Sequence, residues 1–281
     1  MSKEFSDNEK LLIEETDVPG TRESLAQDLR NLGVKAGMLV EVHASLSNIG
    51  WVCGGSVAVV QALMDVVTDV GTLVMPTQTH RYSDPAKWRF PSVPQSWLPT
   101  LYEALPAFDP QVTPTQLMGQ IAETFRTWPG VVRSSHPTVS FAAWGKYAQT
   151  IIANHSLDYG LGEGSPLARI YDLHGHVLLL GVSYNKCTSL HLAEYRARNP
   201  KQTTERSPLL ENGQRVWKTY HDIELDTTQF LSIAGEFESK YSNQDVVKTD
   251  FVGSAIARLF PQRLAVDCAV AWINKWNPTR Q

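Results

Sequence analysis

One short segment of the sequence combines a histidine and a carboxylate at helical spacing. Residues 188–194 read TSLHLAE. In a helix, His191 and Glu194 lie three positions apart on one face, so their side chains meet. A carboxylate bonded to one ring nitrogen fixes the histidine tautomer and leaves the other nitrogen free to accept a proton. The spacing therefore predicts a general base, with a structural ion pair as the alternative interpretation.

Two other chemistries are open to the same segment. A metal site needs a third protein ligand at a recognisable spacing, and the other histidines of the chain form no such pattern, so the sequence predicts no metal site. Cys187 stands four residues before His191, which leaves a Cys–His nucleophile as an alternative. A lone cysteine at a strand-to-helix junction is more often a small buried residue.

A second segment has the composition of an anion cradle. Residues 45–55 read SLSNIGWVCGG, which places small hydroxyl residues and glycines between an apolar run and the next helix. Backbone N–H groups at such a helix start suit phosphate oxygens. The segment is neither a Walker loop nor a GxGxxG fingerprint, so no nucleotide fold is implied. It predicts a cofactor or anion site, unless the two glycines serve packing only.

A third segment, residues 133–141, reads RSSHPTVSF. Arg133 beside two serines is suited to phosphate through charge-assisted hydrogen bonds. His136 precedes a proline, which holds it in an extended conformation where it can line a pocket. The alternative is a capped loop with a solvent-facing arginine, and the residues alone favour that alternative.

Apolar runs around these segments predict an α/β sheet. Buried strands are expected at the short apolar runs 38–43, 71–76, 139–144 and 176–182. Helices are expected at 21–32, 57–67, 118–125, 146–153, 167–171, 188–197, 226–240 and 265–276. Alternation after residue 200, as in 215–220, predicts antiparallel strands. His191 follows the carboxyl end of a predicted strand, where open α/β sheets place their sites.

Two stretches lie outside this pattern. Residues 1–20 are polar and end in Pro19-Gly20, which predicts a flexible or loosely docked lead. Residues 77–115 are rich in Pro, Trp and Tyr and lack periodicity. A connection of that length is usually functional or inserted, so we expect a loop-rich insertion there.

Composition excludes several classes of protein. A net charge of −4 supplies no basic footprint for nucleic acid. No apolar run approaches the ~20 residues of a membrane helix, and the charged N-terminus is no secretory signal. Three cysteines without a CxxC pair favour a reducing compartment, and we expect a cytoplasmic protein that is a monomer or a homodimer.

Taken together, the chain resembles the aminoglycoside 3-N-acetyltransferase family, also called the antibiotic N-acetyltransferase family. Five stretches carry the resemblance in the family's order: 43–55, 71–77, 133–137, 164–167 and 178–194. The resemblance runs from about residue 21 to the C-terminus. It implies one α/β domain over residues 21–281, with a central mixed sheet flanked by helices and the loop-rich insertion at 77–115.

The resemblance also implies acetyl-CoA as donor and an amine as acceptor. The family's catalytic histidine and its carboxylate partner fall on His191 and Glu194, and the Thr188 hydroxyl is a candidate for oxyanion stabilisation. The predicted cofactor-binding residues are Ser45, Leu46, Ser47, Trp51, Val52, Gly54, Gly55, Thr77, Arg133 and Ser134. The predicted acceptor-binding residues are Tyr82 in the insertion, His136, Asp158 and Asp222.

The predicted function is therefore acetyl transfer from acetyl-CoA to the 3-amino group of an aminoglycoside antibiotic, assisted by a histidine base. Three alternatives stay open on the sequence. The acceptor could be a different amine, the reaction could pass through Cys187 as an acyltransferase or thioesterase, or the protein could bind coenzyme A without turnover.

Overall fold

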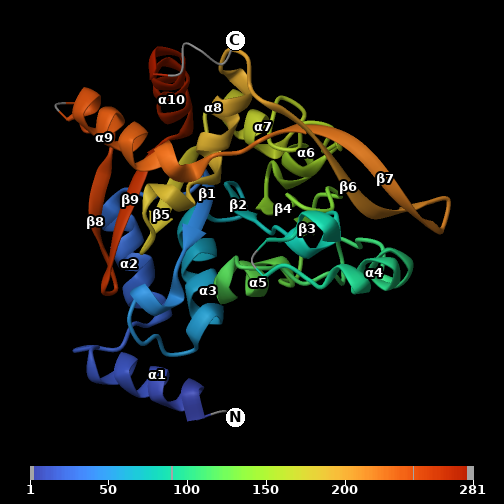
Figure 1. Cartoon of the computed structure of the whole chain (residues 1–281). Helices are drawn as coiled ribbons and strands as arrows, with labels where there is room; N and C mark the ends of the chain where they lie inside the picture. The colour runs from blue at the N-terminus through green and yellow to red at the C-terminus, as the bar shows by residue number, and fades with distance from the viewer. Residues whose placement is uncertain (1–2, 90, 243, 277–281) are drawn as a thin grey trace.

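The computed structural model describes residues 3–89, 91–242 and 244–276. In this part of the chain, a seven-stranded mixed sheet has the order β3-β4-β2-β1-β5-β9-β8, and β6 and β7 form a separate ribbon (Figure 1). The strands are β1 (Leu39–Ala44), β2 (Thr72–Pro76), β3 (Val132–Arg133), β4 (Phe141–Gly145), β5 (His176–Leu180), β6 (Gln202–Glu211), β7 (Gln214–Ile223), β8 (Lys248–Val252) and β9 (Ala255–Pro261).

The helices of the described residues are α1 (Lys3–Glu14), α2 (Arg22–Leu32), α3 (Gly55–Val67), α4 (Leu98–Ala104), α5 (Gly119–Arg126), α6 (Ala148–Ile152), α7 (Pro166–Asp172), α8 (His191–Arg196), α9 (Phe230–Tyr241) and α10 (Gln262–Trp276). All of them except α1 and α4 pack on one of the two faces of the sheet. One buried cluster joins α2, α3 and α5 to the sheet, and another joins helices α6 to α10 to the opposite face. The sheet is therefore the middle layer of three.

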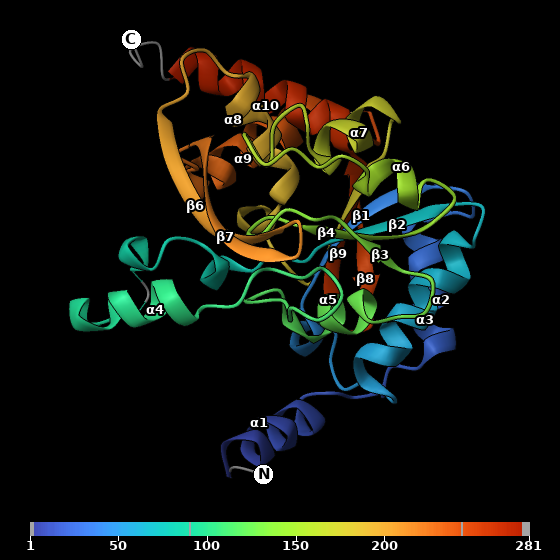
Figure 2. The same cartoon turned by 90° about the vertical axis from the view of Figure 1, so that its right-hand side faces the viewer.

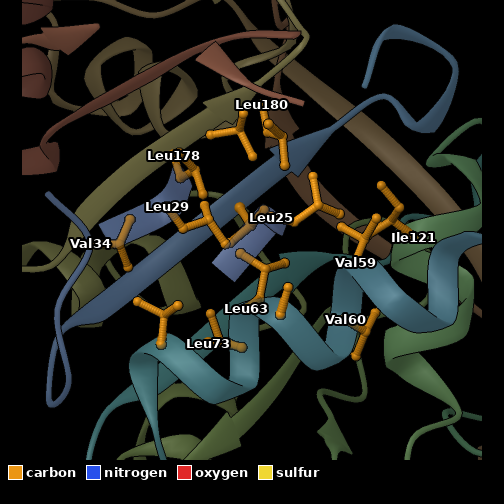
Figure 3. Close-up of a cluster of buried hydrophobic side chains, with 14 of the residues drawn as sticks. Leu25, Leu29, Val34, Val59, Val60, Leu63, Leu73, Ile121, Leu178 and Leu180 are labelled. Atoms are coloured by element: carbon orange, nitrogen blue, oxygen red, sulfur yellow. The ribbon is translucent and has the colours of Figure 1, made fainter. Parts of the chain in front are cut away.

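The α2 side shows how the sequence produces this layering. Helix α2 begins at a capping box between Thr21 and Ser24. Its Leu25 and Leu29 are buried against Leu63 of α3 and Leu178 of β5 (Figure 3). Burial of each such side chain contributes about 1.5–3 kcal/mol, so the spacing of the leucines is what docks the helix.

Strand direction decides where a site can form. Strand β1 pairs in parallel with β2 on one side and with β5 on the other, and the outer neighbours β4 and β9 run antiparallel. The carboxyl ends of β1, β2 and β5 therefore meet at one edge. Side chains alternate along β1, so Val40 and Val42 face α2 and α3, whereas Leu39, Glu41 and His43 face α6 to α10.

The ribbon of β6 and β7 curves away from the body toward α4 (Figure 2). Two residues of β7 near the hairpin turn hold the ribbon against α4. Trp217 Nε1 donates to the Tyr102 carbonyl at 2.8 Å, and Arg215 donates to the carbonyls of residues 102, 103 and 105. The Phe108 N–H donates to the Pro208 carbonyl at 3.0 Å. The 77–115 segment is thereby tied to the ribbon as well as to the sheet.

The expected α/β architecture is confirmed, with the insertion built mostly from short 3₁₀ turns and α4. Four further elements were not predicted. Helix α1 occupies the polar lead, the two-residue strand β3 precedes β4, and the antiparallel pair β8–β9 stands between the two closing helices. Strand β8 alternates weakly and is largely exposed, which explains why no apolar pattern marks it.

Candidate active site

A cleft of about 1680 Å³ opens at the carboxyl ends of the three parallel strands. Its floor includes residues 42–44 of β1 and residues 75 and 76 of β2. Its walls are the 45–55 segment, residues 117–122 at and just before the start of α5, the 181–188 segment, and three residues of α1 with the Glu15 that follows it. The predicted cofactor loop is thus one wall of this cleft, and Thr188 lines the same cleft.

The 45–55 segment is held rigidly between the strands and α3. Asn48 Nδ2 donates to the Gly181 carbonyl at 2.6 Å, which ties the segment to the loop after β5. Gly54 is the N-cap of α3 with a φ of 86°, a left-handed conformation that favours glycine. No side chain caps this helix start, and Gly54 and Gly55 line the cleft. Uncapped N–H groups at a helix N-terminus suit an anion, so the predicted anion site at this segment stays a prediction that the geometry allows.

His191 and Glu194 meet as their spacing predicted. Residues 188–190 form a 3₁₀ turn that leads into α8, and His191 is its first residue. The distance from His191 Nδ1 to Glu194 Oε2 is 2.5 Å, and the other carboxylate oxygen accepts the Asp226 N–H at 2.8 Å. The Phe230 ring packs against the imidazole, with 4.9 Å between centroids. Nε2 makes no hydrogen bond to the residues the structure describes, so it is available to a substrate.

A second histidine, His43, lies on the cleft floor beside a carboxylate that the sequence analysis did not single out. Glu41 is fully buried on β1, and its Oε1 lies 3.2 Å from His43 Nε2. Its other oxygen accepts the Ser189 hydroxyl, and Gln262 Nε2 donates to the Ser189 oxygen at 2.8 Å. A charged residue in the middle of the apolar run LVEVHA was the sequence signal that marks this group.

Thr77, Arg133 and Ser134 do not line the cleft; they support the neighbouring loops instead. The Arg133 guanidinium donates to the carbonyls of Thr77 at 2.6 Å and Thr113 at 2.5 Å, and it stacks on the Phe108 ring. Burial lowers the pKa of Arg133 to about 10. Thr77 and Ser134 are buried. The donors expected to reach a phosphate are therefore already committed to protein acceptors, and sequence cannot show that commitment.

His136 is also enclosed rather than exposed to a pocket. Its Nδ1 accepts backbone N–H groups from Thr138 and Val139, so Nε2–H donates to the Leu157 carbonyl at 3.2 Å. The ring lies 4.9 Å from that of His155, which is also buried. Burial, and next the charge of His155, hold the pKa of His136 well below its usual range. Its contacts are those of a neutral residue that orders the 155–165 loop.

The other predicted acceptor contacts are spread over two regions. Tyr82 is half-buried in the insertion, edge-on to Phe108. Asp158 is exposed and accepts the His221 N–H at 2.7 Å. Asp222 accepts the Tyr195 hydroxyl at 2.5 Å, and burial raises the pKa of this carboxyl. These residues lie outside the cleft lining, so the structure does not unite them with the cofactor loop.

Cys187 is fully buried between the loop after β5 and α8. Burial raises the pKa of its thiol, and the Glu41 carboxyl acts in the same direction. A nucleophilic cysteine needs an accessible thiolate. The structure therefore argues against the alternative in which Cys187 carries the acyl group.

None of the described helices is long and apolar enough to cross a membrane. Across residues 3–89, 91–242 and 244–276, no three His, Cys, Asp or Glu side chains converge on a possible metal position.

The sequence and the fold match those of a known enzyme family. The family model described as aminoglycoside 3-N-acetyltransferase matches residues 42–274. The chain is 46% identical over 264 residues to the SPbeta prophage-derived aminoglycoside N(3')-acetyltransferase-like protein YokD of Bacillus subtilis, covering 94% of this chain and 96% of the relative. The chain belongs to the aminoglycoside 3-N-acetyltransferase family, and it is an acyltransferase-type enzyme.

Solved structures agree with this assignment. The crystal structure of YokD matches with a TM-score of 0.92 and 44% identity, covering 96% of this chain and 99% of that one. The enzyme AAC-IIIb in its binary complex with CoASH matches with a TM-score of 0.80 and 30% identity, covering 92% and 97%. AAC-VIa bound to sisomicin matches equally, with a TM-score of 0.80 and 30% identity, covering 92% and 98%.

Proposed function

We propose that this protein transfers the acetyl group of acetyl-CoA to the 3-amino group of an aminoglycoside, with His191 as general base. The single observation that carries the proposal is the position of His191. It begins α8 three residues after Thr188, which lines the cleft, and its carboxylate partner leaves Nε2 available. The substrates follow from relatives, since AAC-IIIb was solved with CoASH and AAC-VIa with sisomicin.

The donor occupies the cleft in this proposal. Its anionic groups lie against the uncapped start of α3 at Gly54 and Gly55, where backbone N–H groups and the helix dipole favour negative charge. Lys186 lines the same cleft and supplies a cation. Ser45 and Ser47, whose hydroxyls lie 3.2 Å apart, offer further hydrogen bonds along the wall. The thioester end then points toward Thr188.

His191 and Glu194 carry out the proton transfer in this proposal. An alkylammonium must lose a proton before its nitrogen attacks the thioester, and Nε2 of His191 accepts that proton. Glu194, bonded to Nδ1, stabilises the imidazolium that forms. Attack forms the C–N bond and turns the carbonyl oxygen into an oxyanion. Its collapse breaks the C–S bond, the proton on His191 passes to the departing thiolate, and the second proton of the new amide nitrogen leaves to solvent. The Thr188 hydroxyl donates to the carbonyl oxygen as it becomes an oxyanion.

The acceptor approaches from the side of the insertion and the ribbon. Asp158 is an exposed carboxylate beside β7, and Tyr82 is half-buried in the insertion. An acidic and aromatic surface suits a polycationic aminosugar.

We place the reaction in the cytoplasm, since the three cysteines are unpaired in the structure.

The test is thiol release from acetyl-CoA with sisomicin as acceptor. Matched controls are the same aminoglycoside already acetylated on its 3-amino group, and simple alkylamines. We expect turnover on free sisomicin, none on the blocked compound, and a product acetylated at the 3-amino group by mass spectrometry and NMR.

Other outcomes separate the alternatives. Turnover on alkylamines but not on sisomicin would keep the acetyltransferase and change the acceptor. Thiol release without any amine would indicate a thioesterase. Coenzyme A binding by calorimetry without turnover on any amine would reduce the protein to a coenzyme A-binding module.

A further inference from the structure

The floor of the cleft holds a second histidine–carboxylate pair, Glu41 and His43, which the mechanism above does not use. The two residues stand two positions apart on β1 and project from the same face of the sheet, the face covered by α8. Glu41 is fully buried, His43 is 8% exposed, and the His43 ring lines the cleft. The pair thus connects the interior of the protein to the surface on which the donor lies.

Charge balance fixes what the pair presents to the cleft. A buried carboxylate without a cation is costly. Among the described residues, His43 is the one basic side chain within 4.0 Å of Glu41. The facing atoms, Nε2 and Oε1, are buried 3.2 Å apart as an ion-pair contact, without the alignment of a hydrogen bond. An imidazolium that balances the Glu41 carboxylate carries a proton on each ring nitrogen, so one of its N–H groups is Nδ1–H. His43 Nδ1 is then a hydrogen-bond donor.

Glu41 also connects this donor to the base. Its Oε2 accepts the Ser189 hydroxyl, and Ser189 precedes His191 by two residues. Gln262 of α10 donates to the Ser189 oxygen and to the Leu167 carbonyl, so Ser189 is held from both sides. A single buried carboxylate therefore sets the positions of both the cleft histidine and the turn that leads into His191.

We propose that His43 Nδ1–H donates a hydrogen bond to the thioester carbonyl oxygen of bound acetyl-CoA, with Glu41 as the positioning residue. The inference rests on the proposed function. His43 lines the donor cleft between the 45–55 wall and Thr188, so an acyl group directed at His191 lies beside it. As the amine attacks, negative charge collects on the carbonyl oxygen and His43 and Thr188 stabilise it together. No proton leaves His43, since His191 carries the proton from amine to thiol.

The test uses the whole enzyme and acetyl-CoA labelled with ¹³C at the carbonyl, without any amine. A hydrogen bond to this oxygen moves the carbonyl resonance downfield on binding. We expect that shift in the wild type and its loss in His43→Ala. His43→Asn places an amide nitrogen near the position of Nδ1 and should keep part of the shift. His43→Gln places its amide near Nε2, facing Glu41, and should not.

Steady-state turnover with sisomicin gives a second readout. His43→Ala and His43→Gln should lower kcat about 10²-fold, the effect of removing one oxyanion donor, while His43→Asn retains more activity. The dissociation constant of coenzyme A should change less than about threefold in all three. Glu41→Gln should reduce both the shift and kcat, and melting curves verify that each variant folds.

Two results would overturn the inference. An unchanged downfield shift in His43→Ala, or equal activity of the Asn and Gln variants, would show that Nδ1 donates nothing to the carbonyl. Failure of the wild-type enzyme to bind acetyl-CoA at all would instead remove the proposed function, and the role of His43 with it. The first outcome leaves the donor assignment intact, so the two failures are distinguishable.

Discussion

Two histidines of this enzyme, His191 and His155, differ in what surrounds the imidazole ring. His191 has a carboxylate on one nitrogen and nothing on the other, and 12% of its side chain is exposed. His155 is enclosed, with Nδ1 accepting the Ser134 hydroxyl and Nε2 donating to the Gly160 carbonyl at 2.6 Å. One ring keeps a nitrogen without a hydrogen-bond partner among the described residues, whereas both nitrogens of the other are bonded.

The comparison shows what a counter-charge adds to a largely buried ring. A carboxylate stabilises an imidazolium, whereas the hydroxyl and carbonyl partners of His155 carry no charge to offset its burial. Burial accordingly lowers the pKa of His155 to about 4. His136 follows the same pattern, although its place before a proline suggested a pocket residue.

The largest effect is expected from removal of the base. His191→Ala should lower turnover about 10²- to 10⁴-fold, because no other group is placed to take the proton from the amine. Coenzyme A binding should persist, since the ring lies beyond the cleft lining. Thiol release and calorimetry on the same preparation measure both quantities. A variant with near wild-type turnover would eliminate His191 as the base.

Next in size is the carboxylate that makes His191 different from His155. Glu194→Gln keeps the shape and the Asp226 contact but removes the charge that supports the imidazolium. We expect kcat to fall about 10²-fold with little change in KM for acetyl-CoA. The matched control is Glu163→Gln, since Glu163 is an exposed carboxylate paired with Arg196. This change should leave kcat unaltered. Equal effects of the two changes would contradict the assigned role.

The buried ring should affect stability instead. In the unfolded chain the pKa of His155 returns to 6.5, whereas in the folded state it is about 4. The unfolded state therefore binds the extra proton first, and the free energy of unfolding should decrease as pH falls from 6.5 to 4, by at most roughly 3 kcal/mol from this residue. Urea titrations at pH 7 and pH 5 measure the decrease.

His155→Gln should reduce that acid dependence, because it removes one of two neighbouring buried rings whose pKa is lowered, and His136 retains the rest. The control is His221→Gln, since the His221 side chain is 71% exposed and should leave the pH dependence unchanged. If His155→Gln destabilised the protein equally at both pH values without altering the slope, the buried ring would not be the source of the acid sensitivity.

The smallest effect on activity is expected at Cys187. Cys187→Ala removes a buried thiol that no substrate reaches, so turnover should stay within about threefold while the free energy of unfolding drops about 1 kcal/mol from the small cavity. Thiol-release assays measure the turnover, and urea titrations measure the free energy of unfolding. A loss of activity as large as that of His191→Ala would restore the cysteine mechanism.

Sequence reasoning succeeded where function depends on local spacing. His191 and Glu194 meet because three residues of helix separate them, and the glycines at 54 and 55 stand at a helix start because a strand and a helix flank them. These are contacts within one turn or one connection, and periodicity is sufficient to place them.

It failed where contacts come from distant segments. The acceptors of Arg133 are carbonyls at residues 77 and 113, which the insertion brings back over β3. In the sequence, Glu41 is a charged residue that interrupts an apolar strand. Its hydrogen-bond partner, Ser189, comes from a distant turn of the chain. Neither pairing has a local signature, since the sequence specifies residue types but not which loops return to the same edge of the sheet.

The Glu41–Ser189 hydrogen bond joins residues 148 positions apart, and the parallel pairing of β1 with β5 brings them together. Long-range pairings of this kind form slowly, because the intervening chain must close a large loop first. A folding chain can therefore complete the 45–55 segment early and still lack the turn that positions His191. Recovery of enzyme activity during refolding will report the moment at which β5 joins the sheet, later than signals from the N-terminal helices and strands.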